Sequence, residues 1–161
     1  MGFESTSTIL SSSPIAQTVW DYVDKHKLVV GAIKDYPNML KIITFTPSEI
    51  KERYSQMPYV KSPKLSDIPS ANDPQSHEKQ IVNIIHSVGI LEVRYQKALT
   101  FLAWFEPAWG LLDGHEQEIL ELFYINKTLI YELAAILNYS ERQVYRAKDK
   151  AIGKLENLLL I

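Results

Sequence analysis

The chain has 161 residues, no cysteine and a formal net charge of −2, with 46% hydrophobic and 22% charged residues. This composition is ordinary for a folded protein, and it excludes a disulfide framework and a thiolate metal site. No apolar run approaches the roughly 20 residues of a membrane-spanning helix, and the N-terminus lacks the basic and apolar segments of a signal peptide. We therefore expect a cytoplasmic protein with no membrane association.

The first third of the chain predicts a tail followed by short helices. Residues 1–13 are rich in Ser and Thr and predict a disordered tail, and residues 14–56 predict a helical region. Ser13 and Pro14 have the form of an N-cap followed by proline at the first helical position. One helical segment is expected to stop before Pro37, and residues 46–49 (Thr-Pro-Ser-Glu) predict that another begins at Pro47.

The middle of the chain predicts a linker and one long helix. Residues 57–72 contain three prolines and predict a linker, with a Pro-rich loop inside one domain as the alternative. Residues 73–106 predict a helix that ends before Pro107, because apolar residues recur at steps of three and four. This stripe is either the core spine of the N-terminal helices or the seam of a homodimer. It consists of Ile81, Ile84, Ile85, Val88, Leu91, Tyr95, Ala98, Leu102 and Phe105. The aromatic residues around Pro107, Trp104 and Trp109 among them, are expected to be core.

Residues 111–161 predict a three-helix unit with a helix-turn-helix. Asp113 and Glu116 have capping-box spacing for its first helix. The second helix is expected to be capped by Thr128 and to end at Leu137, where Asn138 suits a left-handed stop. Ser140 and Gln143 form another capping box, behind which the third helix begins. Its apolar stripe, which should face the second helix, is Val144, Ala147, Ala151 and Leu155.

The opposite face of this third helix is polar and basic. Between residues 140 and 155, five basic against two acidic residues give a local charge of +3. Arg and Gln at the start of a recognition helix suit guanine and adenine edges, and basic residues further along suit phosphates. The predicted DNA-binding residues are Ser140, Glu141, Arg142, Gln143, Tyr145, Arg146, Lys148, Asp149, Lys150 and Lys154. The alternative is an ordinary solvated face of a helical hairpin.

A wider pattern runs through the same segment: Glu116-x-x-Ile119-Leu120-x-Leu122-x-Tyr124, then Ile130-x-Glu132-Leu133-Ala134-x-x-Leu137-x-x-Ser140-x-x-x-Val144, ending in Lys150-Ala151-x-x-Lys154-Leu155. With this pattern the segment, about a third of the chain, resembles the C-terminal promoter-reading region of sigma factors and the sigma-like phage and prophage regulators of the ArpU type. The resemblance implies base contacts from residues 141–143, 145 and 146, and RNA polymerase as a partner. Tyr145 stands where sigma factors usually have a basic residue, so the DNA site should differ from the standard promoter element.

We therefore predict an all-α, sequence-specific transcriptional regulator that binds double-stranded DNA and is not an enzyme. No cofactor or metal is expected, because the four histidines lack zinc-ligand spacing and the six glycines form no phosphate loop. Two alternatives remain open. One is a phage small-terminase-like subunit, a class that forms rings but has its helix-turn-helix at the N-terminus. The other is a sigma-like module that docks on proteins without binding DNA.

Overall fold

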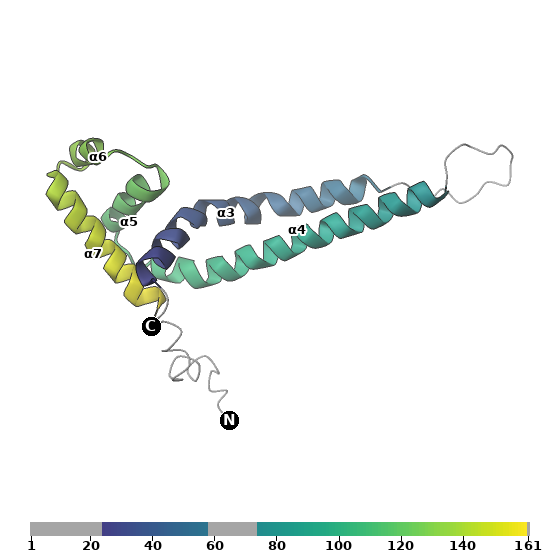
Figure 1. Cartoon of the computed structure of the whole chain (residues 1–161), viewed down its shortest axis with the longest axis horizontal. Helices are drawn as coiled ribbons and strands as arrows, with labels where there is room; N and C mark the ends of the chain where they lie inside the picture. Colours follow the sequence, from purple (N-terminus) through teal and green to yellow (C-terminus); the bar gives the residue numbers. More distant parts are fainter. Residues whose placement is uncertain (1–23, 58–73, 161) are drawn as a thin grey trace, which may run out of the picture. The chain divides into compact units, whose positions relative to one another are not determined.

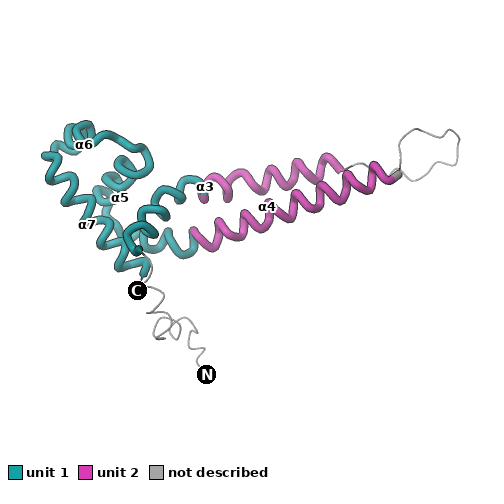
Figure 2. The backbone as a smooth tube through the Cα atoms, viewed as in Figure 1, with its two compact units in different colours: residues 1–38, 102–161 teal, residues 39–101 magenta. Residues whose placement is uncertain are grey.

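The computed structural model describes residues 24–57 and 74–160, and all its regular elements are helical (Figure 1). No strand occurs within these ranges, so the all-α fold class is confirmed. The chain divides into two compact units, one of residues 1–38 and 102–161 and one of residues 39–101 (Figure 2). None of the described helices combines the length and the apolar character needed to cross a membrane. The predicted tail, the helix start at Ser13 and Pro14, and the predicted linker beyond Met57 lie outside the described residues.

The helix α3 (Lys25–Ser55) is continuous, so the predicted stop before Pro37 and the predicted start at Pro47 are wrong. A proline inside a helix removes one backbone hydrogen bond and crowds the preceding turn. Near Pro37 packing favours the continuous helix, because the apolar side chain of Ile33 is buried one turn before it. The side chain of Thr46, just before Pro47, is buried as well. Thr46 is therefore a core residue rather than an N-cap, and its hydroxyl has no hydrogen-bond partner among the described residues.

The helix α4 (Pro74–Trp109) runs three residues further than predicted and includes Pro107. A proline in the last turn removes a single hydrogen bond, and the chain beyond it still closes with the Gly110 amide donating to the Glu106 carbonyl at 2.9 Å. Most of the predicted apolar stripe is the core side of α4, but its member Ile85 is 56% exposed. Its members Val88, Ala98, Leu102 and Phe105 are all buried within the chain itself, as the core-spine interpretation requires.

An aromatic cluster forms the core of the first unit where α3 and α4 meet. The ring centroid of Tyr36 lies 5.0 Å from that of Phe105 and 5.8 Å from that of Trp109. Phe105 and Trp109 are buried, which confirms their predicted core role, whereas Trp104 is more exposed. The Trp104 indole donates to the Leu159 carbonyl at 3.4 Å, so the end of α7 (Glu141–Leu159) is tied to this cluster.

The second unit is an antiparallel pair of helical segments, residues 39–55 of α3 and residues 74–101 of α4 (Figure 2). Its described part has three buried side chains, those of Thr46, Val88 and Ala98. All three are small or medium-sized residues. The pair therefore encloses little core of its own.

Candidate nucleic-acid interface

Three helices and a π-helical turn build the C-terminal part of the first unit: α5 (Gly114–Leu120), η1 (Glu121–Ile125), α6 (Ile130–Leu137) and α7. The predicted capping box of α5 is confirmed. The Asp113 carboxylate accepts from the Glu116 amide at 2.8 Å, and the Glu116 carboxylate accepts from the Asp113 amide at 3.0 Å. The π-helical turn was not foreseen, and nothing in its sequence signals it. It is closed by the Asn126 amide donating to the Glu121 carbonyl at 2.9 Å.

The turn between α6 and α7 has the geometry that its sequence predicts. Asn138 adopts the left-handed conformation with φ 57° and ψ 39°, and the Tyr139 amide donates to the Ala134 carbonyl at 2.9 Å. Ser140 and Gln143 form both hydrogen bonds of the capping box, so α7 begins where predicted. The predicted cap at Thr128 is wrong. Leu129 occupies the N-cap position of α6, and its side chain makes no capping hydrogen bond. Thr128 still belongs to the connection from the π-helical turn, where its amide donates to the Leu122 carbonyl at 2.9 Å.

A small apolar cluster fixes the crossing of α6 and α7. Leu133, Ala134 and Val144 are buried at its centre. Leu122, Phe123, Ile130 and Leu137 pack around them. The predicted stripe of α7 is confirmed at Val144, Ala151 and Leu155, which are buried, and Ala147 is half-buried. Because the small side chain of Ala134 lies in this cluster, the two helices can approach closely.

A contact that sequence reasoning missed braces the turn from α5. The His115 Nε2 atom and the Tyr139 hydroxyl are 2.8 Å apart, and the two rings meet edge to face with centroids 5.4 Å apart. The residues are 24 positions apart, so no local sequence pattern links them. The contact joins the N-terminal end of α5 to the turn that precedes α7, and it helps to hold the start of α7 in place.

The left-handed conformation of Asn138 leads to a stability prediction. Glycine adopts this conformation without steric cost, whereas a β-branched side chain is strained there. We expect Asn138→Gly to leave the free energy of unfolding within about 0.5 kcal/mol of wild type and Asn138→Val to lower it by about 1–2 kcal/mol. Urea unfolding followed by circular dichroism measures both values. Equal destabilisation by the two substitutions would contradict the role assigned to the backbone conformation.

Three basic side chains of α7 form an exposed stripe. Arg142, Arg146 and Lys150 follow one another at steps of four, so they share one side of the helix. All three are exposed, and none forms an ion pair with any residue in the described ranges. Glu141 and Tyr145 are exposed beside them. Cations without an ion-pair partner in the described part of the chain remain available to an anionic ligand.

Lys148, one of the predicted DNA-binding residues, has partners inside the unit. Its side chain is 13% exposed, and its ammonium lies 2.9 Å from the Asp149 carboxylate and 5.0 Å from the centre of the Phe123 ring. Burial acts to lower the pKa of Lys148, but hydrogen bonds and charges from Asp149 and Tyr124 outweigh it and hold the pKa above its usual value. Lys148 therefore stays charged and binds α7 to the π-helical turn. Asp149, also a predicted site residue, is its partner.

Lys154 is engaged in a second internal pair. Its ammonium lies 2.8 Å from the Glu116 carboxylate, whose side chain is 12% exposed. The hydrogen bond from Lys154 lowers the pKa of Glu116 below its usual range, and burial opposes this shift without reversing it. The same carboxylate closes the capping box of α5. The pair therefore fastens α7 to the start of α5, which the sequence did not reveal because the residues are 38 positions apart.

This pair makes the stability of the protein depend on pH. The folded state lowers the pKa of Glu116, so the pair stabilises the protein above the pKa that Glu116 has in the unfolded chain. That contribution is lost as the pH falls through the lower, folded-state pKa. We expect Glu116→Gln to lower the free energy of unfolding by about 1 kcal/mol at pH 7, and the difference from wild type to vanish once the pH has fallen below the folded-state pKa of Glu116. Urea titrations at several pH values test this, and a difference that is constant with pH would contradict it.

The remaining predicted site residues differ in what they can offer. The Gln143 side-chain oxygen accepts from the Ser140 amide at 2.8 Å, so with the capping box intact Gln143 offers a ligand chiefly its amide nitrogen. A two-point contact to adenine uses both amide atoms, which disfavours that role. The Tyr145 ring meets Phe123 at 6.4 Å between centroids while keeping an exposed edge.

The internal pairs change the charge that α7 offers to a ligand. Of the five basic residues between 140 and 155, Lys148 is paired with Asp149 and Lys154 with Glu116. Among the described residues, the exposed side chains of this segment that form no ion pair are then the basic Arg142, Arg146 and Lys150 and the acidic Glu141. Their net charge is +2. The positive charge is smaller than the sequence count of +3, but it is concentrated on the N-terminal half of α7.

Comparison of the chain with models of protein families, with curated proteins and with solved structures found no match. Within the described ranges, no group of three or more His, Cys, Asp or Glu side chains is placed to hold a metal ion. The exposed basic stripe of α7 is therefore the feature on which a functional proposal rests.

Proposed function

We propose that the protein is a sequence-specific DNA-binding regulator of the sigma-like phage or prophage type, and that the N-terminal half of α7 enters the major groove of double-stranded DNA. The observation that carries this proposal is the unpaired stripe of Arg142, Arg146 and Lys150. It lies on a helix whose start is fixed by a capping box, a left-handed turn and the brace from His115. A recognition helix needs such a fixed start, because its first turns contact the bases.

Roles follow from position along α7. Arg142 and Arg146, in the first two turns, are the residues proposed to contact bases, since Arg makes two-point contacts to guanine. Glu141 and Tyr145 lie beside them and would tune the choice of sequence. Lys150, one turn further, is proposed to bind a phosphate. Lys148 and Lys154 are proposed to hold the unit together rather than to contact DNA, as their internal partners indicate.

The test is selection of bound sequences from a random double-stranded DNA pool with the purified full chain. Recovery of one defined motif, lost with Arg142→Ala/Arg146→Ala, is the expected result. The matched control is Arg53→Ala, which removes an exposed arginine from α3 in the second unit. If no sequence is enriched even at low salt, where phosphate contacts are strongest, the proposal is wrong.

The different surroundings of two lysines give a further prediction for DNA binding. Each phosphate contact adds about 1 to the slope of log affinity against log salt concentration. We expect Lys150→Ala to reduce this slope by about 1 and Lys148→Met to leave it unchanged, because the Lys148 ammonium already has Asp149 as its partner. Fluorescence anisotropy at four salt concentrations measures the slopes. Equal losses for both variants would show that Lys148 also contacts phosphate.

A second candidate function is docking on a protein, with RNA polymerase as the partner that the sigma-like pattern suggests. It is favoured by one observation: α6 and the residue before it expose the apolar side chains of Leu129, Tyr131 and Ile136. Capture of RNA polymerase by the full chain, lost with Tyr131→Ala/Ile136→Ala and kept with Arg142→Ala/Arg146→Ala, would support it. Capture that is indifferent to the α6 substitutions would exclude this surface.

A further inference from the structure

The outer face of α4 in the second unit is apolar and uncovered. Val82, Ile85, Ile90 and Val93 are 55–58% exposed, although each is a residue that usually lies in a core. The described part of this unit buries three side chains, a small core for a helical pair of this length. A pair of helices with so little core and so much exposed apolar surface needs a further partner for stability.

The apolar residues of this face are arranged symmetrically about the midpoint between Ser87 and Val88. Val82 and Val93 are equally far from that midpoint, and so are Ile85 and Ile90. When two α4 helices run antiparallel about this midpoint, Val82 of each copy lies opposite Val93 of the other. Ile85 likewise lies opposite Ile90. A two-fold interface between identical chains requires this self-complementary order.

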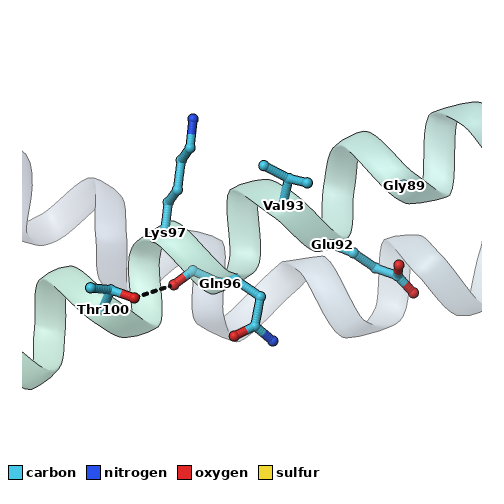
Figure 3. Close-up of a pocket in the computed structure, with 6 residues that line it drawn as sticks. All are labelled: Gly89, Glu92, Val93, Gln96, Lys97 and Thr100. Carbon is cyan, nitrogen blue, oxygen red and sulfur yellow. Dashed lines mark hydrogen bonds between the residues drawn. The ribbon is translucent and has the colours of Figure 1, made fainter.

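Two hollows in the surface of α4 follow the same symmetry. One is lined by Gln75, Glu78, Lys79, Val82 and Asn83, and the other by Gly89, Glu92, Val93, Gln96, Lys97 and Thr100. Figure 3 shows the second hollow, with Val93 and Lys97 projecting from α4 in the same direction. In the antiparallel pair of α4 helices, five of the six residues that line the second hollow of one copy lie opposite the five residues that line the first hollow of the other. Gly89 is the exception, and it falls opposite His86.

The charges at the two ends of the face are complementary under this reversal. Glu78 of one copy lies opposite Lys97 of the other, and the symmetry makes this pair twice. Within a single chain, neither residue forms an ion pair with a described residue. A Cβ atom added at Gly89 would meet nothing within 4 Å, so the space beside it is open to a side chain of a second copy.

We propose that two copies of the chain form a homodimer by pairing their α4 helices antiparallel about the midpoint between Ser87 and Val88. In the dimer the outer faces of the two α4 helices bury each other and form an additional hydrophobic core. Each dimer carries two copies of α7. The interface differs from the predicted dimer seam, because the seam residues Val88 and Ala98 are buried within one chain, and Ile85 is the one seam residue that it shares. The proposal goes beyond DNA binding and does not depend on it.

The test uses charge reversal and the mass of the full chain in solution without DNA. Sedimentation equilibrium should give twice the chain mass of 18.5 kDa. Glu78→Lys places two lysine pairs in the dimer and Lys97→Glu places two glutamate pairs, so each should raise the dissociation constant about tenfold. An equimolar mixture of these two variants pairs Lys with Glu at both ends. It should therefore form mixed dimers with an affinity within about twofold of wild type.

Two further variants complete the experiment. Val93→Asp places a carboxylate against the partner's Val82 and should raise the dissociation constant about 100-fold or more. Glu49→Lys is the matched control, since it reverses an exposed charge on α3 and should leave the dimer intact. Circular dichroism reports whether each variant keeps its helices, and restoration by mixing does not depend on any one variant being fully stable.

Four results would overturn the proposal. A monomer at all concentrations up to the solubility limit leaves no dimer to explain, and a larger ring points to the terminase-like alternative. A dimer that resists both Val93→Asp and charge reversal uses another surface. Failure of the mixture to restore pairing excludes this antiparallel register. Because the mass is measured without DNA, each of these results is separate from success or failure of the DNA-binding proposal.

Discussion

The double variant Arg142→Ala/Arg146→Ala should bind the selected DNA site at least about 100-fold more weakly than wild type, a loss of about 3 kcal/mol. Both guanidinium groups are exposed, and neither forms an ion pair with a residue that the structure describes. Their removal therefore takes away contacts to DNA without leaving an unpaired charge in the fold. Fluorescence anisotropy with a labelled duplex of the selected motif, at one fixed salt concentration, measures the loss.

Two comparisons separate this result from a general effect of charge. Arg53→Ala removes the same side chain from the second unit and should change the affinity by less than about twofold. The double variant should also unfold at the same urea concentration as wild type, because neither arginine packs in the core. If the double variant binds the selected site as well as wild type does, α7 is not the recognition helix.

The largest effect on stability is expected for Leu133→Ala. Leu133 is 0% exposed and lies at the centre of the cluster that joins α6 to α7. Truncation removes buried methyl groups and leaves a cavity, so the free energy of unfolding should fall by about 2–5 kcal/mol. Because this cluster fixes the crossing of the two helices, DNA binding should fall at temperatures where the variant begins to unfold. Thermal and urea unfolding followed by circular dichroism measure the change.

Ile136 provides a matched control on the same helix. It lies three residues after Leu133, and its side chain is 59% exposed. Ile136→Ala removes the same number of atoms and should change the free energy of unfolding by less than about 0.5 kcal/mol. Similar losses for the two variants would mean that the cluster is not the core of this unit, and that the face of α6 carrying Ile136 is covered in the folded protein.

Sequence reasoning failed at the prolines for a definite physical reason. A proline inside a helix costs about 3 kcal/mol, so a local reading ends a helix before Pro37 and before Pro107 and starts a new one at Pro47. The structure keeps the helix at all three. In α3 burial of the apolar side chain of Ile33 favours the continuous helix, and in α4 Pro107 lies in the last turn. These compensations depend on which segments pack together, and such information is absent from a short stretch of sequence.

The sequence by itself determined the features that rest on hydrogen bonds between neighbouring residues. The two capping boxes, the left-handed stop at Asn138 and the start of α7 involve residues no more than about five positions apart, so their chemistry can be read locally. Only the tertiary structure decided which cations remain free. Lys154 meets Glu116 from 38 positions away, and Lys148 is held against Phe123 by a π-helical turn with no sequence signal. Pairing across such distances depends on how the helices pack, and it leaves Arg142, Arg146 and Lys150 as the exposed basic stripe.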